Sequence, residues 1–160
     1  MLQQRIQALC SRFQLPLPVP DAAGRTFLTF GGAPSLSFLP VPGGVLLECV
    51  VAVLPSGAAE REHICHRALS LSLSRTLWEW REGLAPCLTA TKADIRVQLR
   101  LPGGEGLLRG GGSALADQQY FEDAVERLLN LAETWRNLLE KDQVASGASE
   151  LMARFPGVWA

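Results

Sequence analysis

The sequence predicts a single α+β domain in which helices pack against an antiparallel sheet. Apolar residues recur at helical spacing in an N-terminal, a central and a C-terminal segment. Between these segments lie shorter apolar runs that glycine and proline separate. The length of 160 residues is that of one ordinary domain with its own core. We therefore expect one domain over residues 1–142, followed by a flexible C-terminal tail at 143–160.

The first predicted element is a short helix at the N-terminus. Its apolar residues recur at intervals of three and four, which places them on one face of a helix. The segment "LPLPVP" at 15–20 ends this helix, because proline cannot continue a helix and restricts the residue before it. The apolar face consists of Leu2, Ile6, Leu9, Cys10 and Phe13.

Three apolar runs follow and predict a three-stranded antiparallel meander. They are "RTFLTF", "PSLSFLPV" and "GGVLLECVVAVLP", and the separators between them, rich in glycine and proline, have the composition of turns. The third run is almost continuously apolar from Val45 to Leu54. We therefore expect both faces of this third strand to be covered by protein.

The segment "HICHRALSLSLSRTLWEW" at 63–80 combines metal-ligand residues with a strand-like alternation of leucine and serine. Only "LSLSLS" fits the alternation, and no glycine or proline interrupts residues 58–82, so a strand here would be exceptionally long. The segment therefore predicts a helix. A structural zinc site needs four ligands, usually from two separated pairs, and no second pair accompanies His63 and His66. We expect no metal site.

This central helix has two apolar faces. At about 100° per residue, one face contains Ile64, Ala68, Leu71 and Trp78. The nearly opposite face contains Cys65, Leu69, Leu73, Leu77 and Trp80. A helix on one side of a sheet needs a single apolar face, so the second face predicts a further partner. Another copy of the chain in a twofold dimer is the commonest solution.

The last predicted elements are a hairpin and a long helix. The segment "PCLTATKADIRVQLRLPGG" alternates apolar and polar residues on both sides of the turn "TKAD". The segment "GGEGLLRGGGS" predicts a flexible loop, since it has no GK[ST] of a P-loop and lacks the last glycine of a dinucleotide-binding motif. From residue 117 to residue 141 a helical stripe runs through Phe121, Val125, Leu128, Ala132, Trp135 and Leu139.

Composition excludes several classes of function. The net charge of −1 does not suit a surface that neutralises nucleic-acid phosphates, and no apolar run is long enough for a membrane span. We therefore expect a soluble cytoplasmic protein that neither binds nucleic acid nor inserts into a membrane. The four cysteines are widely spread, which favours reduced structural thiols. Arg96, Arg100 and Arg109 form a small basic cluster, interpreted first as a solvated strand face and second as a rim for an acidic partner.

The order of elements, together with the absence of a catalytic motif, resembles the class I type III secretion chaperones, the CesT/Tir chaperone family. "LQQRIQALCSRFQLPLP" resembles the opening helix of that family, and "VLLECVVAVLP" its apolar third strand. "LTATKADIRVQLRLP" resembles the late hairpin, and "DQQYFEDAVERLLNLAETWRNLLE" the closing helix. The resemblance covers about residues 1–141. Two features depart from it: this chain is nearly neutral where members are often acidic, and its glycine-rich loops and its tail are longer.

The resemblance implies a homodimer without ATPase activity or cofactor that binds the extended N-terminal segments of secreted effectors in the bacterial cytoplasm. The secretion ATPase is a further implied partner. In the family the second helix and the late hairpin form the dimer interface, which here points to Leu69, Leu73, Leu77 and Leu88. The effector lies on the first helix and the early strands, and often adds a strand. On this chain these implied contacts are Ile6, Phe13, Phe27, Phe30, Leu36, Phe38, Val45 and Leu47.

Two other classes of function stay open at this stage. One is a small enzyme that uses a thiol and a histidine, for which Cys87 with His63 or His66 is compatible with the spacing. The other is an α+β domain that binds a small molecule in an enclosed pocket. Because no motif supports a catalytic residue, we expect no enzyme.

Overall fold

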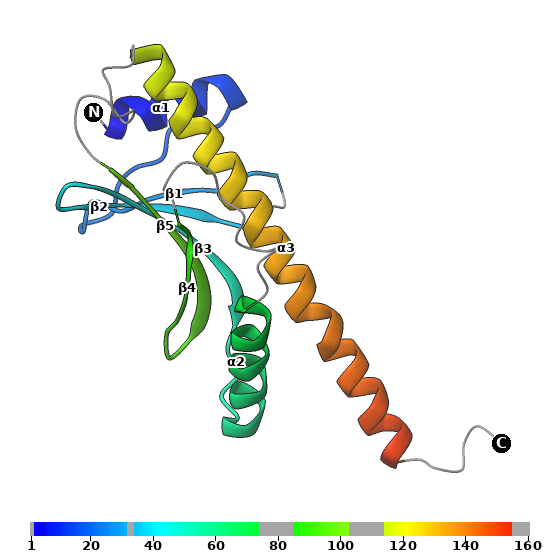
Figure 1. The fold of residues 1–160 in the computed structure, drawn as a ribbon. Coiled ribbons are helices and arrows are strands. Elements are labelled where there is room, and N and C mark those ends of the chain that lie inside the picture. Colours follow the sequence, from blue (N-terminus) through cyan, green and yellow to red (C-terminus); the bar gives the residue numbers. More distant parts are fainter. Residues whose placement is uncertain (1, 32–33, 74–84, 103–113, 155–160) are drawn as a thin grey trace.

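The computed structural model describes residues 2–31, 34–73, 85–102 and 114–154, with side chains as far as residue 140. It has the predicted α+β architecture, in which helices pack on a five-stranded antiparallel sheet (Figure 1). The order of helices and strands is the predicted one. In chain order the elements are α1 (Leu2–Phe13), β1 (Thr26–Leu28), β2 (Leu36–Val41), β3 (Gly44–Val53), α2 (Ala58–Ser72), β4 (Cys87–Ala90), β5 (Asp94–Pro102) and α3 (Ala114–Arg154).

The sheet has the strand order β1-β2-β3-β5-β4, and every neighbouring pair is antiparallel. The predicted meander of the first three strands is confirmed, and so is the hairpin of β4 and β5. Thr91 closes this hairpin, because its backbone N–H donates to the carbonyl of Asp94 at 2.8 Å. The register between β3 and β5 shifts between Val50 and Ala52, which is a bulge that bends the long strand.

The core lies between one face of the sheet, here called the inner face, and the helices α1 and α3 (Figure 1). Phe38 of β2 stacks on Phe121 of α3 with the ring centroids 5.8 Å apart. Neither side chain is exposed to solvent, and the same is true of Trp135. The helical stripe predicted on α3 is therefore the stripe that packs on the sheet. The other fully or almost fully buried core residues include Ile6, Leu9, Leu36, Leu47, Cys49, Ile95, Val97, Leu99, Leu101 and Leu128.

The helix α1 ends in a tight reversal and is tied to α3. Gln14 has a φ of 53°, and the backbone N–H of Leu15 donates to the carbonyl of Cys10 at 2.9 Å. This is the left-handed ending that closes many helices. The guanidinium of Arg12 pairs with Glu122 of α3, and the side-chain amide of Gln118 donates to Glu122 at 2.8 Å. The end of α1 is thus held at a defined place on α3.

Two expectations about the elements need correction. The last helix begins at Ala114 and continues to Arg154, past Gly147, whereas the sequence predicted a helix over residues 117–141. A glycine inside a helix costs only about 1 kcal/mol, so it does not by itself end a helix. The third strand is not covered on both faces, because Val50 and Val53 are 39% and 76% exposed. The predicted end of α2 at residues 74–82 lies outside the described residues.

Figure 1 also shows how α3 projects beyond the sheet at its C-terminal end, with α2 beside its middle portion. Arg67 of α2 donates to the carbonyl of Leu138 at 3.4 Å, which fixes this contact. Among the helices that the structure describes, none is long and apolar enough to cross a membrane.

The stacked pair of Phe38 and Phe121 predicts a large loss of stability on truncation. We expect Phe121→Ala to lower the free energy of unfolding by about 3–5 kcal/mol, because it leaves a cavity between α3 and the sheet. Phe121→Leu should cost about 1–2 kcal/mol. Leu115→Ala, on the same helix but 80% exposed, is the matched control and should cost less than about 0.5 kcal/mol. Urea unfolding followed by circular dichroism measures all three, and equal effects would contradict the assigned core.

Candidate partner-binding site

The eight residues expected to contact an effector fall into two groups. Leu36, Phe38, Leu47 and Ile6 have no exposed surface, and Val45 is 6% exposed. These five side chains point between the sheet and the helices and form the core. Because they are buried in this fold, they cannot also form a surface for a partner. Their burial therefore argues against the effector contacts expected of these five residues. Phe13 and Phe27 are 49% and 50% exposed, and Phe30 is half-buried.

Phe13 and Phe30 form an aromatic corner where α1 ends and the chain leaves β1. Their rings meet edge to face with the centroids 6.0 Å apart. The guanidinium of Arg12 lies over the ring of Phe13 at 5.6 Å from its centroid, which is a cation–π contact. Half of the Phe13 surface remains exposed, so the corner offers an apolar face to a partner.

The strand β1 lies at one edge of the sheet and pairs only with β2 in the described part of the chain. Its register is Thr26 opposite Phe38, Phe27 opposite Ser37 and Leu28 opposite Leu36. Thr26 and Leu28 are buried on the inner face, so Phe27 points to the outer face, away from α1 and α3. An edge strand with unpaired backbone groups can accept a further strand.

The helix α2 has one buried and one exposed apolar face, as the sequence predicts for its described part. Ile64 and Ala68 pack into the core. Leu69 and Leu73 are 65% and 81% exposed on the other side. Leu88 of β4 is partly buried against the core, and Leu77 lies outside the described residues. Leu69 and Leu73 are thus available to a partner, and their place in a dimer stays a prediction.

A row of side chains crosses all five strands on the outer face. Phe27, Ser37, Glu48, Gln98 and Cys87 occupy paired positions on β1, β2, β3, β5 and β4. The side-chain amide of Gln98 donates to Glu48, and the hydroxyl of Ser37 donates to Glu48 at 3.4 Å. The thiol of Cys87 donates to the side-chain oxygen Oε1 of Gln98 at 3.8 Å.

Glu48 is the centre of this row. It is 6% exposed although it lies on the outer face, and Arg96 compensates its charge with an N–O distance of 3.5 Å. Sequence reasoning missed this row. The available signal was a single acidic residue in the apolar run "VLLECVVAV".

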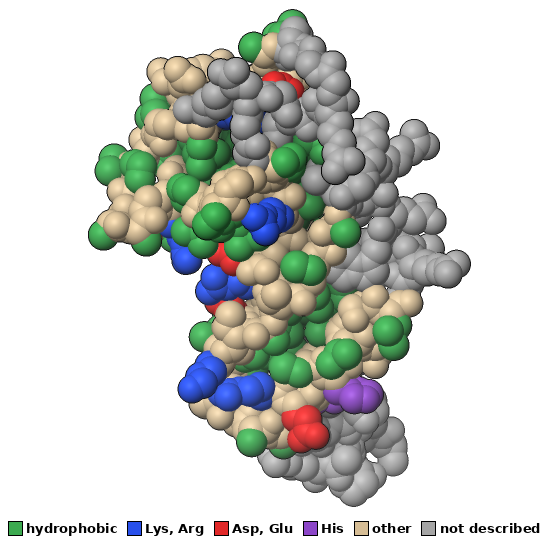
Figure 2. Space-filling view, turned by 60° about the vertical axis from the view of Figure 1, so that its left-hand side comes forward, with side chains coloured by type: hydrophobic (Ala, Val, Ile, Leu, Met, Phe, Trp, Pro, Cys, Tyr) green, Lys and Arg blue, Asp and Glu red, His purple; other side chains and the backbone are tan. Residues whose placement is uncertain are grey.

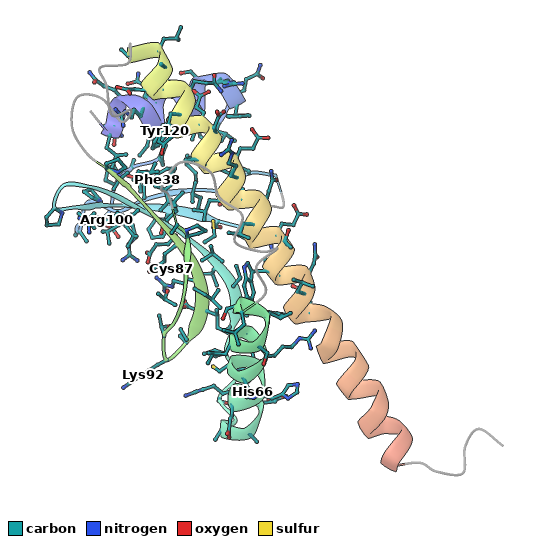
Figure 3. The ribbon with its side chains drawn as sticks, viewed as in Figure 1. Phe38, His66, Cys87, Lys92, Arg100 and Tyr120 are labelled. Atoms are coloured by element: carbon teal, nitrogen blue, oxygen red, sulfur yellow. The ribbon has the colours of Figure 1, made fainter. Side chains whose placement is uncertain are left out.

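The described contacts do not assemble a thiol–histidine site. Cys87 contacts Gln98, whereas His63 and His66 lie on the exposed surface of α2 (Figure 3). Burial and the neighbouring charge of Glu48 raise the pKa of Cys49 to about 12, and burial also raises the pKa of Cys10. Within the described residues, no group of three or more His, Cys, Asp or Glu side chains could hold a metal ion.

Comparison with known proteins identifies the fold. No protein-family model and no curated protein sequence matches the chain. Its fold is similar to the crystal structure of the ExsC–ExsE complex, with 19% identity and a TM-score of 0.55 over 86% of this chain and 92% of that chain. It is also similar to the heterodimeric complex ExoU–SpcU from the type III secretion system of Pseudomonas aeruginosa, with 17% identity and a TM-score of 0.52. That match covers 88% of this chain and 99% of the other.

The chain therefore has the fold found in these two complexes, an antiparallel sheet packed by helices, which is the fold class that the sequence predicted. Neither comparison structure is close enough in sequence to carry individual residues across. The surfaces that this chain itself presents are the aromatic corner, the edge of β1, the exposed face of α2 and the outer face of the sheet.

Thiol reactivity checks the geometry of this site. We expect Cys49 to be labelled by iodoacetamide on the order of a thousandfold more slowly than a free thiol, because a pKa of about 12 leaves little thiolate. Cys87 is exposed and should react like a small free thiol. Mass spectrometry of the labelled protein measures both, and labelling in urea, where all thiols become equivalent, is the control. A hyper-reactive Cys87 would instead support the thiol enzyme.

Proposed function

We propose that this protein is a type III secretion chaperone. It binds the extended N-terminal segment of one or more secreted effectors in the bacterial cytoplasm and keeps that segment competent for secretion. It acts as a binding protein and catalyses no reaction. The observation that carries the proposal is the fold. More than four-fifths of this chain matches a chain in each of two complexes, one of them from a type III secretion system.

The exposed residues suit the capture of an extended segment. A segment that pairs with the free edge of β1 gains backbone hydrogen bonds, which are independent of its sequence. Alternate side chains of such a segment would then lie against Phe27 on the outer face. The aromatic corner of Phe13 and Phe30 would accept apolar side chains beyond the end of the strand. Since β1 is only three residues long, the corner would supply much of the apolar contact.

Dimerisation through α2 belongs to the same proposal. Leu69 and Leu73 are large, exposed and on one face of the helix, whereas the opposite face is already packed. Exposed apolar side chains that adjoin one another on a helix are typical of an interaction surface. A second copy of the chain would cover them symmetrically, with Leu88 near the rim. A dimer would present two copies of the β1 edge to one effector.

Light scattering tests the dimer. We expect the wild-type protein to have the mass of a dimer and Leu73→Glu to have that of a monomer, because a carboxylate cannot be buried in an apolar interface without a partner. His63→Glu places the same charge on an exposed position of α2 outside the leucine face, and it should remain dimeric. A wild-type monomer would remove α2 as the interface. A Leu73→Glu variant that stays dimeric would show that the dimer interface lies elsewhere on the chain.

Binding of effector segments tests the function itself. The N-terminal segments of the secreted proteins of the source bacterium are produced one by one with the chaperone, and the affinity for each segment that copurifies is measured by titration calorimetry. Phe27→Asp and Phe13→Asp should each weaken binding by at least about tenfold, since truncating an exposed aromatic anchor costs about 1–2 kcal/mol or more. Val53→Asp changes another exposed apolar residue and should bind normally. Failure of every segment to bind would refute the proposal.

A further inference from the structure

The outer face of the sheet carries a short apolar strip with an arginine at each end. Leu39 of β2 pairs with Leu46 of β3, and Leu46 pairs with Arg100 of β5. The pairing of Thr26 with Phe38 places Arg25 opposite Leu39 on the remaining side. A Cβ atom at Gly24 would lie 3.8 Å from the ring of Pro40, which agrees with this register. The row Arg25, Leu39, Leu46 and Arg100 is here called the arginine-flanked strip.

The strip faces away from the core. Phe38, Leu47 and Leu99, which adjoin it along their strands, are buried on the inner face. Successive residues of a strand point to opposite faces, so the members of the strip point outward. Leu39 and Leu46 are each only half-buried there. Figure 2, which brings the left-hand side of Figure 1 forward, shows basic side chains among hydrophobic ones on this side of the molecule.

The arginines at its two ends have no carboxylate partner among the described residues, unlike their neighbour Arg96. Arg96 makes two hydrogen bonds of 2.8 Å with Asp94 and also pairs with Glu48, so its charge is compensated. Arg25 instead lies over the ring of Phe27 at 5.9 Å, and its buried Nε has no hydrogen-bond partner. Arg100 is exposed and donates to the backbone carbonyl of Pro42 at 2.6 Å.

We propose that this strip selects effector segments in which apolar residues are flanked by acidic ones, an inference that rests on the proposed function. A segment held at the β1 edge lies beside Arg25 and Phe27 and can continue across the outer face, over β2 and β3, to Arg100 of β5. The two arginines are three strand spacings apart, or about 14 Å. An extended chain covers that distance in about four residues. The preferred pattern is therefore an acidic residue, three mainly apolar residues and a second acidic residue.

Fluorescence anisotropy with synthetic peptides tests the selection. The probe is a labelled extended peptide in which two glutamates flank three apolar residues, with matched peptides that carry glutamine or lysine instead. At low salt we expect the glutamate peptide to bind the wild-type protein about tenfold more tightly than the glutamine peptide, from two exposed charge pairs. The preference should fall as salt rises. Equal affinities for the two peptides would overturn the inference and leave effector binding itself intact.

Variants assign the preference to the strip. The double change Arg25→Gln and Arg100→Gln should abolish the preference, and the double change to glutamate should transfer it to the lysine peptide. Lys92→Gln removes the same charge at the hairpin tip, far from the strip (Figure 3), and should leave the preference unchanged. Arg25→Lys keeps the charge and should keep the preference. If Lys92→Gln lost the preference for the glutamate peptide to the same extent, or if Arg25→Lys lost it, the charges of Arg25 and Arg100 would not be its cause.

Three further outcomes count against the strip. Tight binding of a polyglutamate peptide without apolar residues would show that only charge is recognised. A dimer that dissociates in Leu46→Glu would show that a second copy covers this face. If effector segments bind but the peptides show no preference, the proposed chaperone function stands and the selection by the strip is rejected. If neither effector segments nor peptides bind, the proposed function is rejected as well.

Discussion

The contact between α3 and the inner face of the sheet determines where every other element lies. Phe121 stacks on Phe38, and Trp135 is completely buried further along the same helix. The helix α1 is attached to α3 by Arg12 and Glu122 near the start of that contact, and α2 is attached by Arg67 beyond its middle. The burial of large apolar side chains along one stripe of a single helix thus supplies the main stabilisation and aligns two further helices.

This one-sided packing has a consequence for binding. The inner face is filled by the helices, so a partner can reach only the sheet edge, the ends and outer sides of the helices, and the outer face. The outer face is not uniformly polar, since Phe27 and Val50 are 50% and 39% exposed on it. Neither is it uniformly apolar, because the hydrogen-bonded row centred on Glu48 divides it. A surface of this mixed kind suits an extended segment better than a flat apolar partner.

Periodicity in the sequence predicted the kind and order of the elements, because spacings of two and of three to four are local properties. It could not predict which face of a strand is buried. In "PSLSFLPV" one face of the strand carries Leu36 and Phe38 and the other face carries Leu39, so both faces have apolar residues. The structure buries the first face because α3 lies on that side, and that choice depends on distant residues. For this reason five of the residues expected at a partner surface are core residues instead. Of the arginine-flanked strip, the sequence pointed only to Arg100, as part of a basic cluster.

Glu48 shows how a single polar residue can shape the properties of a whole face. A carboxylate that is 6% exposed needs compensation, and here β5 provides it through Gln98 and Arg96. Arg96 is thereby engaged by Glu48 and Asp94, and its charge is not available to a partner. Among the described residues of this face, the arginines without a carboxylate partner are Arg25 and Arg100, at opposite ends of a row of two leucines. The buried acid thus engages Arg96, which lies four residues from Arg100 along β5, and leaves the spacing between Arg25 and Arg100 as the charge pattern that a segment must match.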